Sequence, residues 1–391
     1  MNEERNIRKN SGKYILTIVL TAIITLAVAF VSIFFLVSRD PLYFKLKQME
    51  YFSKEFYGEI DAQKLEDGIF SGYILGLDDK YAGYYTAEEN AARSDRLDGK
   101  ATGIGVIVVK HPKNDSIYIK QVYDNSPAAR AGVKVGDEII AIDDVLISEK
   151  GYANSVDSLL REIGSTVNLK LKRGGEHLSV SVEYESFAAQ SIFAKMMGDY
   201  GYIEIISFNT ESITQFENAV NSLVASGAKG LIFDLRGNGG GTVGSVTEML
   251  DFLVPKGTIM TVQYSDGTKE VFAKSDASEI NLPMAVLVDE NTASASELFS
   301  ATIRDFNKGV LIGNTTYGKG VMQSTFEFTD GSAAVFTVAE FFPNSGKSFN
   351  GIGLIPDIEV ELNAEQKQNF HILTDIEDPV KQAAIEWMNK Q

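Results

Sequence analysis

The sequence contains no cysteine, and only three of its 391 residues are histidine. Without thiols the chain can form neither disulfide bonds nor thiolate nucleophiles, and zinc sites built on thiolates are excluded as well. The histidines lie far apart, at positions 111, 177 and 371, so no pair has the spacing of metal ligands. We therefore expect neither a metal nor another cofactor.

Basic residues are also scarce. Lysine and arginine together number 36, against 53 aspartate and glutamate residues, which gives a net charge of −17. Such a chain repels polyanions, so we do not expect a nucleic-acid partner. Apolar residues make up 44% and charged residues 23%, as in ordinary globular proteins. The length predicts two folded units with appended segments.

One long run lacks charge altogether. From Tyr14 to Ser38 the sequence is uncharged, and it is long enough to cross a bilayer as a helix, which takes ~20 residues. Basic residues precede it at positions 5, 8, 9 and 13. This pattern predicts a single-pass transmembrane signal anchor in the cell membrane, with residues 1–13 in the cytoplasm and the catalytic part extracytoplasmic. Cleavage after Ala27-Val28-Ala29 is the alternative, but the apolar residues that follow favour a retained anchor.

Hydrophobic periodicity divides the remaining chain into segments. Residues 40–98 have the apolar spacing of helices. Residues 99–184 hold short β-like runs and one amphipathic helix candidate at 153–163, which predicts a small β-rich domain. Strands and helices alternate through residues 185–375, which is typical of an α/β fold with βαβ units and a largely parallel sheet. Residues 376–391 predict a terminal helix.

The small domain carries a specific motif. Residues 126–144 (SPAARAGVKVGDEIIAIDD) resemble the core of PDZ domains, and residues 103–106 (GIGV) stand where that family has its carboxylate-binding loop. Glycines let successive N–H groups converge on one anion, and the next strand can accept a peptide by edge pairing. Without the surrounding match, GIGV would indicate no more than a tight turn into a strand. The resemblance implies that Gly103, Ile104 and Gly105 bind a substrate's C-terminal carboxylate.

By the same resemblance, residues of the predicted helix help to form the apolar groove for the bound peptide. They are Ser155, Leu159 and Leu160.

A serine lies where a predicted strand turns into a predicted helix. The strand MAVLVD ends at residue 289, and the helix follows Ser294. Free N–H groups and the dipole at a helix start favour developing negative charge, which suits a nucleophile. The alternative is structural, because Ser294 and Glu297 also have the spacing of a capping box.

A second glycine-flanked segment favours catalysis. Residues 318–323 (GKGVMQ) follow a strand and, together with residues 292–297 (TASASE), resemble the signature of the carboxyl-terminal processing peptidases, serine peptidases with a Ser-Lys dyad. A lysine can take a proton from serine only when it is neutral, and burial favours the neutral form. In isolation, Lys319 would be interpreted as a solvated loop lysine. The resemblance implies that Ser294 is the nucleophile, Lys319 the general base and Gln323 the residue that orients the amine.

A glycine-rich loop supplies the third part of the resemblance. Residues 234–241 (DLRGNGGG) close one strand and open a helix. A nucleotide-binding loop is the competing interpretation, but the lysine and Ser/Thr of that motif are missing. The family usually has proline where this chain has Gly239. The resemblance implies that the N–H groups of Gly240 and Ala295 form an oxyanion hole.

The resemblance extends from about residue 50 to the end and includes residues 77–86 and 351–358. It implies a crotonase/ClpP-like βαβ peptidase domain with an inserted or preceding PDZ domain, protein or peptide substrates with exposed C-termini, and a homodimer. It also implies cleavage through an acyl-enzyme.

Two other functions fit parts of the sequence. A non-catalytic PDZ scaffold would capture exported chain ends without cutting them, but the joint presence of Ser294, Lys319 and Gln323 argues against it. A crotonase-like acyl-CoA enzyme shares the βαβ pattern and the glycine loop, although the predicted export argues against a CoA substrate.

Overall fold

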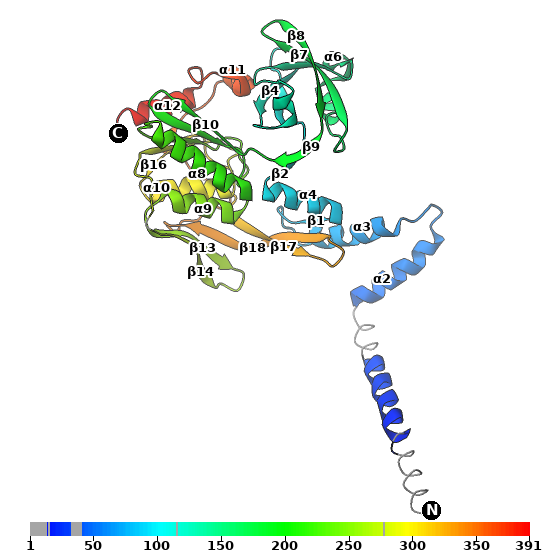
Figure 1. The fold of residues 1–391 in the computed structure, drawn as a ribbon. Helices are drawn as coiled ribbons and strands as arrows, with labels where there is room; N and C mark the ends of the chain where they lie inside the picture. Colours follow the sequence, from blue (N-terminus) through cyan, green and yellow to red (C-terminus); the bar gives the residue numbers. More distant parts are fainter. Residues whose placement is uncertain (1–13, 15, 33–40, 115, 277) are drawn as a thin grey trace, which may run out of the picture. The chain divides into compact units, whose positions relative to one another are not determined.

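The computed structural model describes every residue except 1–13, 15, 33–40, 115 and 277 (Figure 1). The described chain falls into two units, one up to residue 69 and one from residue 70 onward. The first unit is helical at residues 16–32, in α2 (Pro41–Phe52), in the short η1 (Ser53–Glu55) and in the first part of α3 (Ala62–Leu75).

The predicted membrane span lies partly outside the described residues. Among the residues that are described, no helix combines the length and the hydropathy needed to cross a bilayer. The transmembrane prediction for Tyr14 to Ser38 is therefore not confirmed.

The second unit begins with a segment that corrects one prediction. Residues 40–98 were expected to be helical throughout, but β1 (Gly83–Tyr85) interrupts the helices before α4 (Ala87–Asp98). β1 is extended because it pairs antiparallel with residues 333–335 of a distant strand. A capping box between Thr86 and Glu89 then starts α4. A segment far in sequence from the predicted catalytic motifs is thereby paired with a strand that follows Lys319 in the chain.

The small β domain follows. Its main sheet has the order β3-β4-β5-β7-β8, with β6 beside β5, and a separate ribbon pairs β2 with β9. The strands are β2 (Lys100–Gly103), β3 (Val106–Lys110), β4 (Ile117–Val122), β5 (Glu138–Ile142), β6 (Val145–Leu146), β7 (Thr166–Arg173), β8 (Glu176–Glu183) and β9 (Glu185–Ala188). The helices are α5 (Pro127–Arg130), α6 (Ile147–Lys150) and α7 (Tyr152–Asp157). Alternate residues of β7 are buried, so one face of the sheet covers the core.

The helix predicted at 153–163 is shorter than expected. α7 ends at Asp157. The Ser158 hydroxyl donates to the Ser155 carbonyl oxygen (2.7 Å), and serine side chains that bond nearby backbone groups compete with continued helix. Leu159 and Leu160 therefore lie beyond the helix.

The peptidase-like domain is built on a six-stranded sheet with the order β10-β11-β12-β15-β16-β19. All neighbours from β11 to β19 are parallel, and only the β10 pair is antiparallel, as the alternating pattern predicted. The strands are β10 (Ile192–Met197), β11 (Tyr200–Ile205), β12 (Leu231–Asp234), β15 (Met284–Val288), β16 (Gly309–Gly313) and β19 (Ile358–Glu359).

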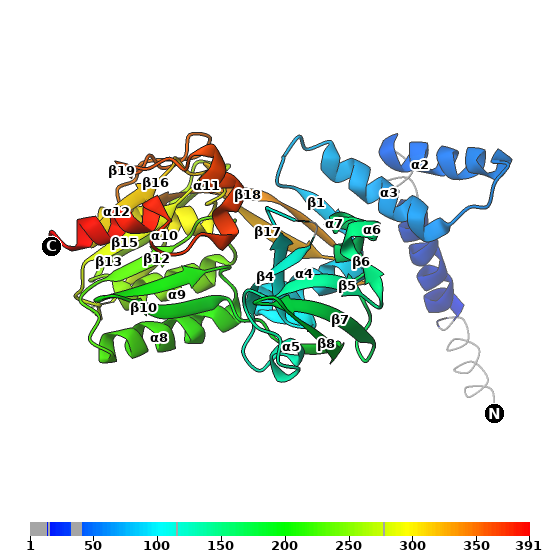
Figure 2. The same ribbon diagram turned by 90° about the horizontal axis from the view of Figure 1, so that it is seen from above.

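Helices cover both faces of this sheet. α8 (Thr210–Ala225), α9 (Val243–Leu253) and α10 (Ala295–Asp305) pack in one hydrophobic cluster, and α12 (Pro379–Met388) packs in another (Figure 2). Neighbouring residues of β12 belong to different clusters, Phe233 to the first and Ile232 to the second. Because strand side chains alternate between faces, the two clusters lie on opposite sides of the sheet.

A second, antiparallel sheet was not predicted. It has the order β1-β18-β13-β14, with β17 also paired to β18. Its strands besides β1 are β13 (Gly257–Tyr264), β14 (Lys269–Ser275), β17 (Val321–Glu327) and β18 (Ala333–Pro343). β17 starts directly after Lys319 and Gly320, so this sheet determines where the predicted base lies. The chain ends through α11 (Ala364–Asn369), η2 (Phe370–Ile372) and α12.

Candidate active site

Ser294 lies between the end of β15 and the start of α10 in an uncommon backbone conformation. Its φ is 58° and its ψ is −116°. Few residues other than glycine adopt a positive φ, and such strain persists where the surrounding structure enforces it, often at functional sites. The predicted capping box between Ser294 and Glu297 is also present. The Ser294 N–H donates to the Glu297 carboxylate (2.9 Å), whereas the Glu297 N–H donates to the Ser294 carbonyl oxygen (2.9 Å).

Glu297 connects the serine segment to the lysine segment. Its side chain is fully buried. One carboxylate oxygen accepts from the Thr316 hydroxyl (2.5 Å) and the Gly318 N–H (2.7 Å). The other accepts from the N–H groups of Ser294 (2.9 Å) and Lys319 (2.8 Å). The sequence indicated Glu297 only as a capping residue; its bonds to residues 316–319 needed the tertiary structure.

Lys319 is half-buried, and its flanking glycines allow close backbone packing. A Cβ at Gly318 would lie 2.8 Å from the Gly353 nitrogen, and one at Gly320 would lie 2.9 Å from the Asn350 Cβ. The Lys319 Nζ lies 4.6 Å from the centroid of the Tyr81 ring. The backbone packing at the two glycines takes the amine partly out of water.

Burial lowers the pKa of the Lys319 amine below its ordinary value. The carboxylates of Asp79 and Glu297 oppose this shift, and the Lys80 ammonium adds to it. A lowered pKa raises the neutral fraction of the amine, and only the neutral form can accept a proton.

Ser294 and Lys319 line the same cavity, whose volume is about 380 Å³. Gln323 and Ala295 line it as well, together with apolar side chains of α9, β13, α10, β17 and β18. These are Val243, Val246, Met260, Leu298, Val321, Met322 and Phe341. The predicted nucleophile and base therefore face one space, although they come from different layers of the domain.

Gln323 makes contacts other than the predicted one. Its amide nitrogen donates to the Thr337 hydroxyl (3.1 Å) and to the Val321 carbonyl oxygen (3.4 Å). Orientation of the Lys319 amine by Gln323 therefore stays a prediction.

The glycine loop lies directly against Ser294. A Cβ at Gly240 would come within 3.0 Å of the Ser294 Cβ, and its φ of 108° also requires glycine. The Gly240 N–H donates to the Asn238 side-chain oxygen (2.8 Å), so this predicted oxyanion donor already has a partner. Ala295 is the first residue of α10, where an N–H has no partner within the helix.

Asn238 holds the loop in place, and the sequence analysis did not identify it. Its side chain is 2% exposed and donates to the Ile205 carbonyl oxygen (2.7 Å). Its own carbonyl oxygen accepts from the Ala293 N–H (3.0 Å) and the Ser296 hydroxyl (3.0 Å). Asn238 thus joins the glycine loop to the start of α10.

The predicted carboxylate-binding loop connects β2 and β3. Gly105 has a φ of 83°, and a Cβ there would lie 2.1 Å from the Ser126 Cβ. The Ile104 carbonyl oxygen accepts from the Ala128 N–H (2.8 Å), which fixes the loop on the domain. Among the described strands β3 pairs only with β4, so its other edge is available for a peptide strand. Gly103, Ile104 and Gly105 are not among the residues that line the Ser294 cavity.

The predicted groove residues behave differently from one another. Ser155 is fully buried, Leu159 packs against the core of the small domain, and Leu160 is 79% exposed. The prediction that these residues lie on the helix holds for Ser155 and is wrong for Leu159 and Leu160, because α7 ends at Asp157.

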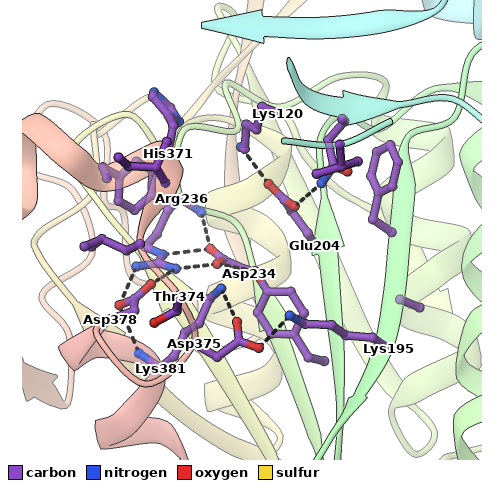
Figure 3. Close-up of a pocket in the computed structure, with 18 of the residues that line it drawn as sticks. Lys120, Lys195, Glu204, Asp234, Arg236, His371, Thr374, Asp375, Asp378 and Lys381 are labelled. Atoms are coloured by element: carbon purple, nitrogen blue, oxygen red, sulfur yellow. Dashed lines mark hydrogen bonds and ion pairs between the residues drawn. The ribbon is translucent and has the colours of Figure 1, made fainter. Parts of the chain in front are cut away.

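A larger cavity of about 730 Å³ lies between the small domain and the peptidase-like domain (Figure 3). Lys120 of β4 pairs with Glu204 of β11 (2.8 Å) across it. Lys195 and Lys381 both pair with Asp375, at 2.5 and 2.9 Å. Its cations are thus matched by carboxylates.

Arg236 is the most buried cation of this cavity. It binds Asp234 (2.6 Å) and Asp378 (2.8 Å), and all three side chains are at most 6% exposed. Asp378 caps α12, and Arg236 immediately precedes the glycine loop. These ion pairs support the glycine loop from behind. The cavity that they line is distinct from the one that Ser294 and Lys319 share.

Comparison with known proteins agrees with this geometry. The model of peptidase family S41 matches residues 199–360, and the model of the PDZ domain matches residues 102–184. The carboxy-terminal processing protease CtpA of Bacillus subtilis is 32% identical over 319 residues, which cover 81% of this chain and 68% of that protein. A CtpA-like serine protease of Staphylococcus aureus is 30% identical over 320 residues, 81% of this chain and 64% of that protein.

A solved structure shows the same fold. It is an S41 protease of Bacteroides fragilis, 18% identical, and the match covers 82% of this chain and 90% of that one with a TM-score of 0.61. The fold and the sequence matches together define a serine peptidase that carries a PDZ domain. The chain belongs to peptidase family S41, the family of the carboxy-terminal processing proteases.

Proposed function

We propose that the chain is an endopeptidase that recognises the C-termini of protein or peptide substrates and cleaves them with a Ser294-Lys319 dyad. The observation that carries this proposal is the buried Glu297 carboxylate, which binds the backbone of both residues and so fixes the two segments beside one cavity. The strained backbone of Ser294 and the lowered pKa of Lys319 add support.

The chemistry is acyl transfer in two stages. The neutral Lys319 amine takes the Ser294 hydroxyl proton while the serine oxygen bonds to the scissile carbonyl carbon. The resulting ammonium gives that proton to the departing amine, which leaves an acyl-enzyme. Water, deprotonated by the same amine, then releases the acyl group and restores the serine.

Negative charge on the carbonyl oxygen needs donors that are already in place. The Ala295 N–H at the start of α10 is the first donor in this proposal. Gly240 is the second, and its N–H exchanges the Asn238 side-chain oxygen for the substrate oxyanion (2.8 Å to Asn238 at rest).

Substrate capture is assigned to the PDZ domain. The terminal carboxylate binds at Gly103, Ile104 and Gly105, and the peptide adds as a strand beside β3. The unpaired edge of β3 is the feature that supports this part of the proposal. The same domain contacts the peptidase sheet through Lys120 and Glu204, so peptide docking can be coupled to cleavage.

Location and assembly are part of the same proposal. The uncharged run from Tyr14 to Ser38, with basic residues before it, supports a single-pass anchor and an extracytoplasmic catalytic part. Apolar side chains of α2 are exposed, among them Phe44 and Met49 at 55% and 62%. A homodimer would cover such surface.

The deciding experiment compares the full chain in detergent with its Ser294→Ala and Lys319→Ala variants on an unfolded protein substrate. Ser226→Ala and Lys347→Ala alter exposed residues and serve as matched controls. We expect both site variants to lose turnover by a factor on the order of 10³ or more and both controls to retain it. Equal turnover by all five proteins would reject the dyad. Capture of peptides without cleavage by the unmodified chain would leave the scaffold function instead.

A further inference from the structure

Two lysine side chains lie over one aromatic ring beside the cavity. The Lys319 Nζ is 4.6 Å from the centroid of the Tyr81 ring, and the Lys80 Nζ is 4.7 Å from it. Lys80 is exposed and also lies 5.4 Å from the Tyr317 ring centroid. The predicted base therefore shares an aromatic ring with a second cation that comes from a distant part of the sequence.

Asp79 fixes the position of Tyr81. One carboxylate oxygen of Asp79 accepts the Tyr81 N–H (3.0 Å), and the other accepts the Thr337 N–H of β18 (2.8 Å). The Thr337 hydroxyl in turn accepts from Gln323 (3.1 Å). The ring is thus tied to the same strand that contacts the predicted orienting residue.

The backbone next to Tyr81 is held equally firmly. Gly83 to Tyr85 form β1 and pair with residues 333–335 of β18. β18 also pairs with β17, which follows Lys319 in the chain, so the segment around Tyr81 and the segment of Lys319 belong to one sheet. The ring is therefore pre-positioned and need not be ordered during catalysis.

We propose that Tyr81 is a positioning residue for Lys319, and that Lys80 balances its effect. The ring holds the amine beside the cavity and stabilises the ammonium that forms when the serine proton is transferred. This inference rests on the proposed function, because it concerns Lys319 as the general base.

The proposal rests on two opposing interactions of the Lys319 ammonium, its attraction to the Tyr81 ring and its repulsion by Lys80. The face of an aromatic ring attracts an ammonium, by an amount that grows as water is excluded. An interaction that strengthens as the proton arrives stabilises the transition state more than the resting enzyme. Lys80 acts in the opposite sense, because a second positive charge disfavours protonation of Lys319.

Other ionisable groups also lie around Lys319. Asp79 and Glu297 favour the ammonium, whereas Lys80 disfavours it. Arg93 of α4 lines the same cavity and donates to the Thr325 hydroxyl (3.0 Å). Variants of Tyr81 and Lys80 leave these contacts intact, so they isolate the ring and its second cation.

The experiment is the pH profile of kcat/KM for the full chain with Tyr81→Leu, Tyr81→Phe and Lys80→Met. Within the described structure the buried Tyr81 hydroxyl has no hydrogen-bond partner, so Tyr81→Phe keeps the ring and breaks no such bond. We expect Tyr81→Leu to move the acid limb to lower pH by about 0.5 to 1 unit and to lower kcat, because the ammonium loses the ring. Tyr81→Phe should keep the unmodified profile.

Lys80→Met should move the acid limb in the opposite direction, to higher pH, because the repelling charge is gone. This residue is exposed, so its variant tests the proposal even if Tyr81→Leu fails to fold. An unchanged limb in folded Tyr81→Leu or in Lys80→Met, or a shift in Tyr81→Phe equal to that in Tyr81→Leu, would overturn the inference. Full activity of Lys319→Ala would instead overturn the proposed function itself.

Discussion

The carboxylate of Glu297 accepts the Lys319 N–H at 2.8 Å with the same oxygen that accepts the Ser294 N–H. A buried carboxylate is costly unless hydrogen bonds compensate it, and here four donors do so. The segments that hold Ser294 and Lys319 therefore depend on one side chain for their mutual position.

Glu297→Gln should disrupt both stability and cleavage. The amide NH₂ of glutamine would face N–H donors, and at least two of them would lose an acceptor. We expect a loss of about 3 kcal/mol in the free energy of unfolding, and a fall in kcat well beyond that of the control. Thermal unfolding and turnover of Glu290→Gln, an exposed change in the same loop, provide the comparison. Equal melting temperatures for the two variants would contradict this account.

Activity should rise with pH until Lys319 is neutral and then level off. Because burial lowers the pKa of this amine, the midpoint should lie below the ordinary value for lysine. The unfolded chain binds the same proton more tightly, so the Lys319 contribution to stability should also increase as pH rises between the folded and unfolded pKa values. Initial rates and melting temperatures across that range measure both effects. A midpoint at the ordinary lysine value would contradict a lowered pKa for Lys319.

Gly105→Ala should damage the PDZ loop far more than Gly132→Ala. Both glycines have a φ of 83°, but an added Cβ meets Ser126 at 2.1 Å in the first case and open space in the second. Gly132→Ala should cost about 1 kcal/mol from backbone strain alone, and Gly105→Ala about 3 kcal/mol because the crowding adds to it. Amide hydrogen exchange in β3 and β4 measures the difference locally. Similar exchange in both variants would show that the loop relaxes around the methyl group.

A peptide's free C-terminus should matter for capture and for cleavage. We expect a peptide with an apolar C-terminal residue to bind at least tenfold more tightly than its amidated form, because the amide removes the anion that the loop receives. Calorimetric titration of the Ser294→Ala chain measures binding without cleavage. Equal affinity of the two peptides would remove the carboxylate role of Gly103, Ile104 and Gly105.

Asp378→Asn should destabilise the domain behind the glycine loop. The change leaves Arg236 with one buried carboxylate in place of two, and we expect a loss of about 3 kcal/mol. Asp199→Asn breaks an exposed pair with Lys229 and should have no measurable effect. Chemical denaturation of both variants tests the contrast, and equal midpoints would speak against a structural role for Arg236.

Much of the fold was accessible from the sequence because its signals are local. The βαβ alternation predicted the parallel sheet, and the motif at residues 126–144 predicted the PDZ domain, which the family comparison confirms. The errors had two causes. β1 is a strand because it pairs with the distant β18, whereas α7 is short because of a local bond from the Ser158 hydroxyl to the Ser155 carbonyl oxygen.

The candidate site divides in the same way. Gly240, which packs against Ser294, and the two glycines that flank Lys319 were predicted as parts of the site, because sequence motifs show where the backbone needs glycine. The roles of Tyr81 and Asn238 were not, because each acts on residues from another segment. Sequence spacing carries no information about such contacts.

The sequence by itself determined that this chain has a serine between a strand and a helix and a lysine between two glycines, and it determined the family. Whether the amine of that lysine is partly buried, as its proposed role as base requires, was decided only by the tertiary structure. An amine is neutral near physiological pH only when burial removes its water. Burial of Lys319 is produced by Glu297 and by the backbone of residues 350–353 packed against its flanking glycines, and these segments meet only when the chain has folded.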